Sequence, residues 1–485
     1  MKLSDKELGM ERNISRRDFL NGAAAVTATG TIPGCSIGDS VDAEVASYPP
    51  GRTGLRGSHP GSYEAAHELA WQGRQDWGRV QDAESDVYDL VVVGAGISGL
   101  AAAYLYRQKN PDARILILDN HDDFGGHAKR NEFELDGRTI ISYGGSQILQ
   151  EPGSYNAATK NLLTDLGVEA ERFETAFDHE FFRRNGLEDA TYFASERFGS
   201  DRLVKRSLME YRQFLPLAKT SLDVEDAVAQ MPLGENARRE LLQLIGTREN
   251  RLADIPDDEQ QEYLWRISYR EFLERHMGIT EPEVFALYQG LIVDSGTSIE
   301  VSSALSVMGY SGFPGLKATA LGDRDVVSEP YIHHFPDGNA SVARLLVRKM
   351  IPQVAAGTTM DDIVMAKFDY SRLDEKDSNV RLRLNSMIVR VEHEGSAEQS
   401  QQVSATYIKN GEAHRVRGKH CVMAGYNAMI PHICPELPQG QRGPCVWHQG
   451  ANRLYQCFAQ QLARVEKARH WFLRISGRLL RCFDA

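Results

Sequence analysis

Apolar residues along the chain follow two different spacings, and each spacing predicts a different kind of element. Uninterrupted apolar runs at 89–93 and 114–118 are typical of strands buried on both faces of a parallel sheet. Between about 151 and 331 apolar residues recur every three or four positions, which predicts amphipathic helices. These helices are expected at 155–166, 207–215, 234–246, 260–277 and 281–291.

A further strand, a glycine turn and a helix are expected at 331–350, with the helix at 342–350. The runs 381–391 and 405–408 predict two strands of a small sheet, and 419–424 predicts another short strand. Together these patterns predict an α/β fold: a Rossmann-type nucleotide-binding domain with a parallel sheet, and an inserted, mostly helical domain. The nucleotide-binding domain would comprise 87–150 and 331–443, and the helical domain 151–330. Residues 48–86, rich in Pro, Gly, Ser and His, are expected to form an irregular lead-in.

A glycine-rich turn joins the first expected strand to a helix. Gly94 permits the tight turn, Gly96 leaves the backbone N–H groups open to a pyrophosphate, and Gly99 lets helix and strand approach closely. The pyrophosphate would rest on the helix N-terminus, beside Ile97 and Ser98. Asp119, which ends the second strand, is placed to accept hydrogen bonds from ribose hydroxyls. The sequence therefore predicts a dinucleotide site, with Asn120 as a further contact.

A second glycine pair, Gly125-Gly126, follows the second strand and is followed by His127. Sequences of this form resemble the flavoprotein superfamily that includes amine oxidases and phytoene desaturases. That resemblance implies FAD as the cofactor, although Arg usually stands where His127 does. With Lys129 and Arg130 close by, the cation that meets the phosphate is left open.

Two further loops resemble flavin-facing segments of this superfamily. Gly144, Gly145, Ser146 and Gln147 resemble the small-residue loop that passes the flavin ring, with an ordinary strand turn as the alternative. The strand around Ile388 resembles the one whose backbone meets the adenine. Lys317, in a glycine-rich loop, is either a lysine that holds a water near the flavin or an exposed loop lysine. No other catalytic residue is assigned, and no metal site is expected, because the adjacent residues His333 and His334 would point to opposite faces of a strand.

Charge narrows the range of partners. The chain has 55 basic and 67 acidic side chains, a net charge of −12, which argues against nucleic acid and favours cationic ligands. No apolar run reaches the roughly 18 residues that would span a bilayer.

Residues 1–47 contain Ser15-Arg16-Arg17-Asp18-Phe19-Leu20 before a weakly apolar stretch, which resembles a twin-arginine export signal; a basic helix cap is the alternative. Cys35 stands in a sequence that resembles a lipoprotein cleavage box, so a lipid anchor is a further hypothesis.

The segment from Ser15 to Pro438 resembles one narrower family, the exported bacterial spermidine dehydrogenases. The resemblance is carried by 53–62, 119–133, 334–348 and 424–427. It implies a periplasmic enzyme, exported by the twin-arginine translocase, that passes a hydride from the carbon beside a polyamine nitrogen to the flavin. The family is also associated with haem, which would carry electrons onward to an electron acceptor. The alternatives are a desaturase or porphyrinogen-oxidase relative with an apolar substrate, and a non-catalytic remnant.

The tail at 444–485 differs from the rest of the chain. It is basic, with seven Lys or Arg residues against two acidic ones, so the remaining residues carry a net charge of −17. Five of the six cysteines lie in the last 65 residues. Read one base out of frame, the tail permits a sequence that resembles the family's continuation. We therefore expect a frameshifted, truncated product, with weak or no flavin binding and poor solubility; a basic C-terminal helix is the alternative.

Overall fold

The computed structural model describes residues 48–52, 57, 59, 61–208, 222–292, 298–309, 311–322 and 329–438. The chain divides into two units, Met1–Tyr48 and Pro49–Ala485, and every element below belongs to the second. The export signal, Cys35, most of the helix expected at 207–215 and the tail at 444–485 lie outside the described residues.

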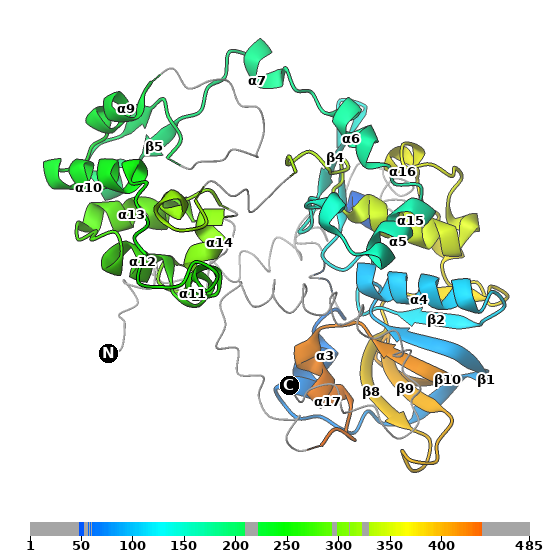
Figure 1. Cartoon of the computed structure of the whole chain (residues 1–485). Helices are drawn as coiled ribbons and strands as arrows, with labels where there is room; N and C mark the ends of the chain where they lie inside the picture. The colour runs from blue at the N-terminus through cyan, green and yellow to red at the C-terminus, as the bar shows by residue number, and fades with distance from the viewer. Residues whose placement is uncertain are drawn as a thin grey trace, which may run out of the picture. The chain divides into compact units, whose positions relative to one another are not determined.

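A six-stranded sheet forms the centre of the nucleotide-binding region (Figure 1). Its strands, in spatial order, are β7 (Val380–Arg383), β2 (Ile115–Leu118), β1 (Val80–Val93), β10 (Glu412–Met423), β9 (Val403–Lys409) and β8 (Met387–His393). The first four are parallel, and β9 and β8 continue the sheet in antiparallel fashion. The predicted α/β class with a mainly parallel sheet is confirmed. The carboxyl ends of four parallel strands thus meet at one edge, where ligands bind in open α/β sheets.

The continuous apolar runs arise because this sheet is covered on both faces. Leu90 and Val92 of β1 pack in one core with α4 (Ile97–Lys109) and α15 (Ala340–Met350). Val91 and Val93 point to the other face, in a core that includes residues of α3 (Glu64–Ala70) and α17 (Ile430–Ile433). Alternate residues of a strand face opposite sides, so a strand buried on both sides has no polar positions.

Two strand predictions differ from the structure. The run 381–391 forms two strands rather than one, because Asn385 adopts a left-handed conformation (φ 52°) between β7 and β8. Both strands join the main sheet instead of a small separate one. The lead-in at 48–86 is also more regular than expected: it contains η1 (Pro49–Gly51), α3 and the first half of β1. That half of β1 is largely exposed and pairs with β10 through its backbone, so it leaves little apolar signal.

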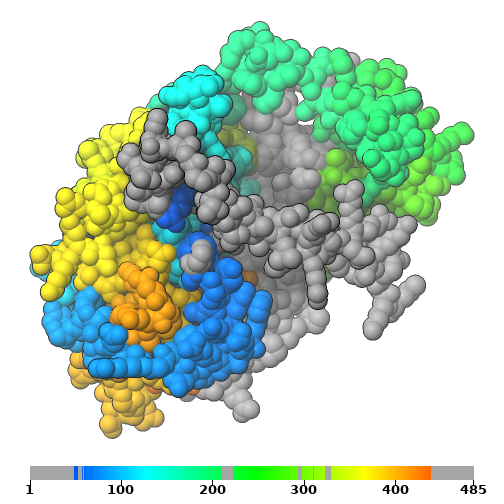
Figure 2. All heavy atoms as spheres, turned by 180° about the vertical axis from the view of Figure 1, so that it is seen from behind, coloured from blue at the N-terminus to red at the C-terminus, as the bar shows by residue number. Residues whose placement is uncertain are grey.

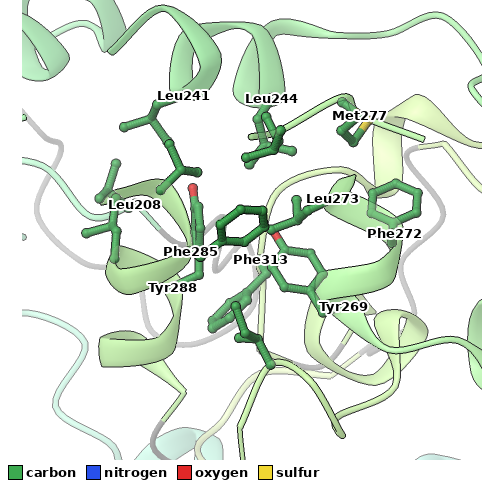
Figure 3. Packing of buried hydrophobic residues seen from close by; sticks show 14 of the residues in the cluster. Leu208, Leu241, Leu244, Tyr269, Phe272, Leu273, Met277, Phe285, Tyr288 and Phe313 are labelled. Carbon is green, nitrogen blue, oxygen red and sulfur yellow. The ribbon is translucent and has the colours of Figure 1, made fainter. Parts of the chain in front are cut away.

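The helical region has a hydrophobic core of its own, shown in Figure 3, whose fully buried aromatic residues include Tyr269, Phe272, Tyr288 and Phe313. Its helices are α8 (Ser195–Phe198), α9 (Val224–Gln230), α10 (Glu235–Gly246), α11 (Gln260–Arg266), α12 (Tyr269–Arg275), α13 (Pro282–Leu291), α14 (Ala304–Gly309) and η3 (Leu316–Ala318), with the hairpin β5 (Thr191–Phe193) and β6 (Arg202–Val204). The helix expected at 260–277 is in fact α11 and α12. It breaks because the Ser268 side chain accepts a hydrogen bond from the Glu271 N–H and so starts a new helix.

The boundary of the helical region falls later than residue 151. Buried residues of this separate core run from Phe193 to Leu321, whereas Leu166 and Phe173 pack in the core of the nucleotide-binding region. The connecting elements are the hairpin β3 (Arg130–Leu135) and β4 (Arg138–Tyr143), η2 (Pro152–Ser154), α5 (Ala157–Asp165), α6 (Ala170–Ala176) and α7 (Phe181–Arg184). After α15 come η4 (Pro352–Val354), α16 (Asp362–Met365), η5 (Tyr370–Arg372) and later η6 (Asn427–Met429).

Segments distant in sequence therefore adjoin in the nucleotide-binding region. α3 packs against α17 and β8, and Figure 2 shows the blue N-terminal residues bordering the orange C-terminal ones on the surface. Over the described ranges, no helix is both long enough and apolar enough to cross a bilayer.

Candidate dinucleotide site

The turn after β1 contains two glycines that the fold itself requires. Gly94 has a φ of +105°, and a Cβ there would lie 2.7 Å from the carbonyl oxygen of Ala424, the residue after β10. A Cβ on Gly99 would lie 2.0 Å from the carbonyl oxygen of Gly94. Both distances are too short for any side chain, so Gly94 serves the turn where it passes the end of β10, and Gly99 serves the close approach of α4 to that turn.

Gly96 stands in the same turn but has no such packing requirement. It is the N-cap of α4, with φ −69° and ψ 171°, a conformation open to any residue. A Cβ there would have the Cα of Gly126 as its nearest neighbour, at 3.8 Å, an ordinary van der Waals separation. No side chain caps α4, so its first amides, including those of Ile97 and Ser98, are those an anion would meet.

The second glycine pair lies directly against this turn. Gly125 bridges to Gly96, and its N–H donates to the Ala95 carbonyl oxygen at 2.8 Å. Gly125 and Gly126 both have positive φ, +97° and +60°, and a Cβ on Gly126 would lie 3.1 Å from the Cα of Gly96. The structure thus brings the two predicted glycine loops together as a cradle of bare backbone.

Asp119 joins the two loops. Its Oδ2 accepts a hydrogen bond from the Ala95 N–H at 2.6 Å, and its Oδ1 accepts one from the His121 N–H at 2.9 Å. The carboxylate is 8% exposed. The sequence predicts that Asp119 accepts hydrogen bonds from the ribose. The structure adds that its carboxylate also joins the loop after β2 to the glycine turn after β1. Asn120 donates from Nδ2 to the Ser62 carbonyl oxygen, and its buried Oδ1 has no partner within the described residues.

The three basic side chains after the second glycine pair have different surroundings. His127 is exposed, and its carbonyl oxygen accepts from the Gly145 N–H at 3.0 Å. Lys129 is buried and donates from Nζ to the Asp123 carbonyl oxygen. Arg130 is buried in ion pairs with Asp337 and Glu132. Arg130 therefore stabilises the fold through its ion pairs, and His127 is the side chain of the three that is most accessible to a ligand.

The small-residue loop packs between the glycine cradle and the chain that returns from the helical region. The Gly144 N–H donates to the Lys129 carbonyl oxygen at 2.8 Å. Ser146 accepts from Asn339 through both its hydroxyl, at 2.9 Å, and its carbonyl oxygen, at 3.0 Å. Gln147 Oε1 accepts from the Tyr331 hydroxyl at 2.6 Å. The contact of this loop with a flavin stays a prediction.

The return segment itself differs from the expected strand. Residues 331–339 form turns and irregular backbone, and α15 starts at Ala340. His333 is buried and His334 is half-buried. In the part of the chain that the structure describes, no three His, Cys, Asp or Glu side chains gather as a metal site would require.

The remaining predicted contacts are spread over other elements. Ser386, just before β8, donates from its N–H to the Asp119 carbonyl oxygen at 2.8 Å, and Asn385 likewise donates to that of His121. Ile388 lies two residues further, with its side chain buried in the core under the sheet. Lys317 lies on η3 in the helical region. The roles of Ile388 and Lys317 stay predictions.

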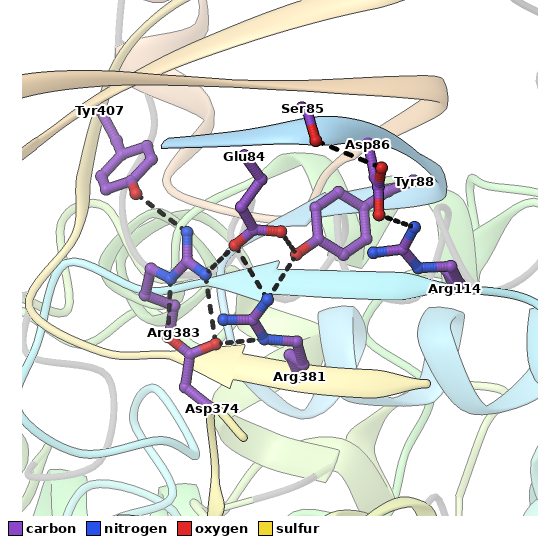
Figure 4. A network of polar contacts seen from close by, with 9 residues as sticks. All are labelled: Glu84, Ser85, Asp86, Tyr88, Arg114, Asp374, Arg381, Arg383 and Tyr407. Carbon is purple, nitrogen blue, oxygen red and sulfur yellow. Dashed lines mark hydrogen bonds and ion pairs between the residues drawn. The ribbon is translucent and has the colours of Figure 1, made fainter. Parts of the chain in front are cut away.

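An ionic cluster on the sheet was not predicted (Figure 4). Arg381 and Arg383, two residues apart on β7, each pair with both Glu84 and Asp374. Burial alone would raise the pKa of Glu84, but hydrogen bonds from Tyr88 and Arg383 lower it overall. Because each buried guanidinium meets carboxylates, we interpret this cluster as structural support for β7 and not as a ligand site.

Comparisons with known proteins agree with the nucleotide-binding region. Residues 92–166 match the NAD(P)-binding Rossmann-like domain family. An FAD-dependent monooxygenase of Pyrenophora dematioidea is 52% identical over 40 residues, 8% of this chain and 7% of that relative. An FAD-dependent monooxygenase of Aspergillus sclerotiorum is 50% identical over 40 residues, with the same coverage. The matches span less than a tenth of these relatives.

Among solved structures, a putrescine oxidase with bound putrescine is 18% identical, with a TM-score of 0.36 over 74% of this chain and 63% of that one. A cyclohexylamine oxidase from Brevibacterium oxydans is also 18% identical, with a TM-score of 0.35 over 74% of this chain and 62% of that one. The sheet, the glycine cradle and the family match together define a Rossmann-like nucleotide-binding domain in this region of the chain.

Proposed function

We propose that this chain is an FAD-dependent oxidoreductase. The observation that carries the proposal is Gly96: the fold leaves room for a side chain there, yet the residue is glycine at the uncapped N-terminus of α4. A pyrophosphate needs that bare backbone, since a Cβ would separate it from the helix amides. The cradle formed with Gly125 and Gly126 fits the group.

The second glycine loop favours FAD over a nicotinamide dinucleotide. A single glycine turn with an acidic residue after the next strand would serve either cofactor. Gly125-Gly126 packed against Gly96 is the additional feature that resembles flavoproteins, and the two monooxygenase relatives are named as FAD-dependent. When bound, FAD would supply an acceptor for two electrons and a proton as hydride.

We propose further that the substrate is a polyamine such as spermidine, oxidised at a C–N bond. Support comes from the resemblance of 53–62, 119–133, 334–348 and 424–427 to the exported spermidine dehydrogenases, and from the net charge of −17 outside the tail. Excess carboxylates raise the local concentration of a polycation. On this proposal the enzyme acts in the periplasm after export, and Cys35 is a lipid anchor.

Two measurements on the whole chain test the proposal in order. Titration with FAD, NAD and NADP should give saturable binding with FAD the tightest. The FAD-loaded chain should then reduce a dye with spermidine faster than with an apolar polyene or a porphyrinogen. Tightest binding of NAD would overturn the cofactor assignment. Binding of FAD with preference for an apolar substrate would overturn the polyamine assignment alone.

We also propose that residues after about 443 are read out of frame. The change in charge and cysteine content at 444 supports this. DNA sequence across the codons for Gln441 to Cys445 should show an inserted or lost base relative to independent reads. An intact frame in those reads would refute it.

A further inference from the structure

The described residues between 49 and 62 are 49–52, 57, 59, 61 and 62; they precede β1 and take no part in the glycine turn. Even so, they contact the residues that directly follow Asp119. Arg52 forms an ion pair with Asp122 Oδ2, and His59 Nε2 accepts a hydrogen bond from the Asp122 N–H at 3.1 Å. The Ser62 carbonyl oxygen accepts from Asn120 Nδ2. These three bonds join residues 58 to 70 positions apart.

His59 and Ser62 are themselves joined to each other. Ser62 is 4% exposed, and its hydroxyl donates to the His59 carbonyl oxygen at 2.6 Å and accepts from the His59 N–H at 3.1 Å. The next helix, α3, packs against β8 and α17 (Figure 1). The bonds from His59 and Ser62 to Asp122 and Asn120 therefore start from residues that are hydrogen-bonded to each other, just before a packed helix.

The loop of residues 120–122, which follows Asp119, carries buried polar atoms without hydrogen-bond partners among the described residues. Asn120 Oδ1 and His121 Nδ1 are buried and make no hydrogen bond within the described residues. The His121 ring lies edge-on to His59, with 5.8 Å between the ring centroids. Burial lowers the pKa of His121, so its ring is neutral and offers one donor and one acceptor. Buried polar groups are normally satisfied, so two such atoms in adjacent residues point to a ligand.

The position of this loop suggests which part of a dinucleotide it meets. Asp119 precedes it directly and is tied to the glycine turn through the Ala95 N–H. In a dinucleotide fold the end of this second strand faces the ribose of the adenosine half. Adenosine has an amino group and hydroxyls that can donate, and ring nitrogens that can accept.

We propose that Arg52 and His59 are positioning residues for the adenosine half of the cofactor. They hold Asp122, and with it Asn120 and His121, so that the two free polar atoms can bond the nucleotide. This proposal rests on the proposed function and names residues outside the glycine motifs.

The test measures ADP, FAD and NAD affinity, together with thermal unfolding, for the whole chain. Arg52→Met and His59→Leu should each weaken ADP binding about tenfold, the usual effect of losing a hydrogen bond to a charged or orienting group. Arg52→Lys should retain most of the affinity, because the cation beside Asp122 remains. Arg74→Met is the matched control: Arg74, which follows α3, pairs with Glu68 of that helix and not with the loop after Asp119, so ADP affinity should not change.

The outcomes separate the two proposals. If the wild-type chain binds NAD more tightly than FAD, the proposed function fails. If it binds FAD and ADP, and Arg52→Met and His59→Leu bind ADP as tightly as wild type, the positioning role alone fails. Should Arg52→Met not fold, His121→Phe decides the question. It removes a buried atom without a partner, so the unfolding temperature should stay the same or rise while ADP affinity falls; unchanged affinity would overturn the proposal.

Discussion

Replacement of Gly96 by alanine tests whether this glycine is required for ligand binding or for folding. The new Cβ would lie 3.8 Å from Gly126 Cα, and the backbone conformation suits alanine. Alanine is a poorer N-cap than glycine by up to about 1 kcal/mol, but it lowers the entropy of the unfolded chain by a similar amount, about 0.4–1 kcal/mol. We expect the free energy of unfolding to change by less than about 0.5 kcal/mol, whereas FAD affinity falls at least about tenfold, or about 1.4 kcal/mol.

The assay pairs urea denaturation with quenching of FAD fluorescence. Gly246→Ala is the matched control, because Gly246 at the end of α10 also has ordinary backbone geometry and nothing within 4 Å of a new Cβ. It should leave FAD affinity unchanged and raise the free energy of unfolding by about 0.5–1 kcal/mol, because alanine is favoured over glycine within a helix. Retention of wild-type FAD affinity in Gly96→Ala would refute the argument that the bare backbone at Gly96 meets the pyrophosphate.

Three further predictions concern the fold. Gly99→Ala, whose Cβ would lie 2.0 Å from the Gly94 carbonyl oxygen, should lower the free energy of unfolding by about 3 kcal/mol in urea titrations; a loss under about 1 kcal/mol would mean that the turn relaxes freely. Arg383→Met leaves Glu84 and Asp374 with one guanidinium and should cost about 3–5 kcal/mol at pH 7. The pKa of Glu84 is lowered in the folded chain, so the Glu84 carboxylate contributes to stability above its ordinary pKa of 4.5, and this contribution is lost as the pH falls through the lower folded value. The difference in the free energy of unfolding between wild type and Arg383→Met should therefore shrink in that pH range. An undiminished difference would contradict the charge pairing. Burial raises the pKa of the Cys421 thiol to about 12, so iodoacetamide at pH 8 should label the Cys421 peptide only after unfolding, as mass spectrometry would show; rapid labelling of the native chain would contradict its burial.

Much of the nucleotide-binding region could be predicted from the sequence because its signals are local. The apolar runs before Gly94 and Asp119 correspond to strands, and the apolar spacing after 340 corresponds to α15. The glycine turn needs only neighbouring residues to be recognised. Breaks inside longer patterns were missed, because Ser268 and Asn385 change the chain's direction without disturbing the apolar spacing around them.

The rest of the candidate site depends on contacts between distant residues. Nothing near Asp122 in the sequence indicates that Arg52 and His59 meet it. Arg130, which looked available for a phosphate, is paired with Asp337, more than 200 residues away. Such pairings follow from how distant segments pack together, which no local pattern specifies.

FAD binding by the whole chain tests the central claim most directly. Fluorescence titration with FAD, with NAD as competitor, should give saturable binding at one site per chain that NAD displaces poorly; the frame proposal predicts that this binding is weak. Displacement of bound FAD by NAD at lower concentration than FAD itself would contradict the account.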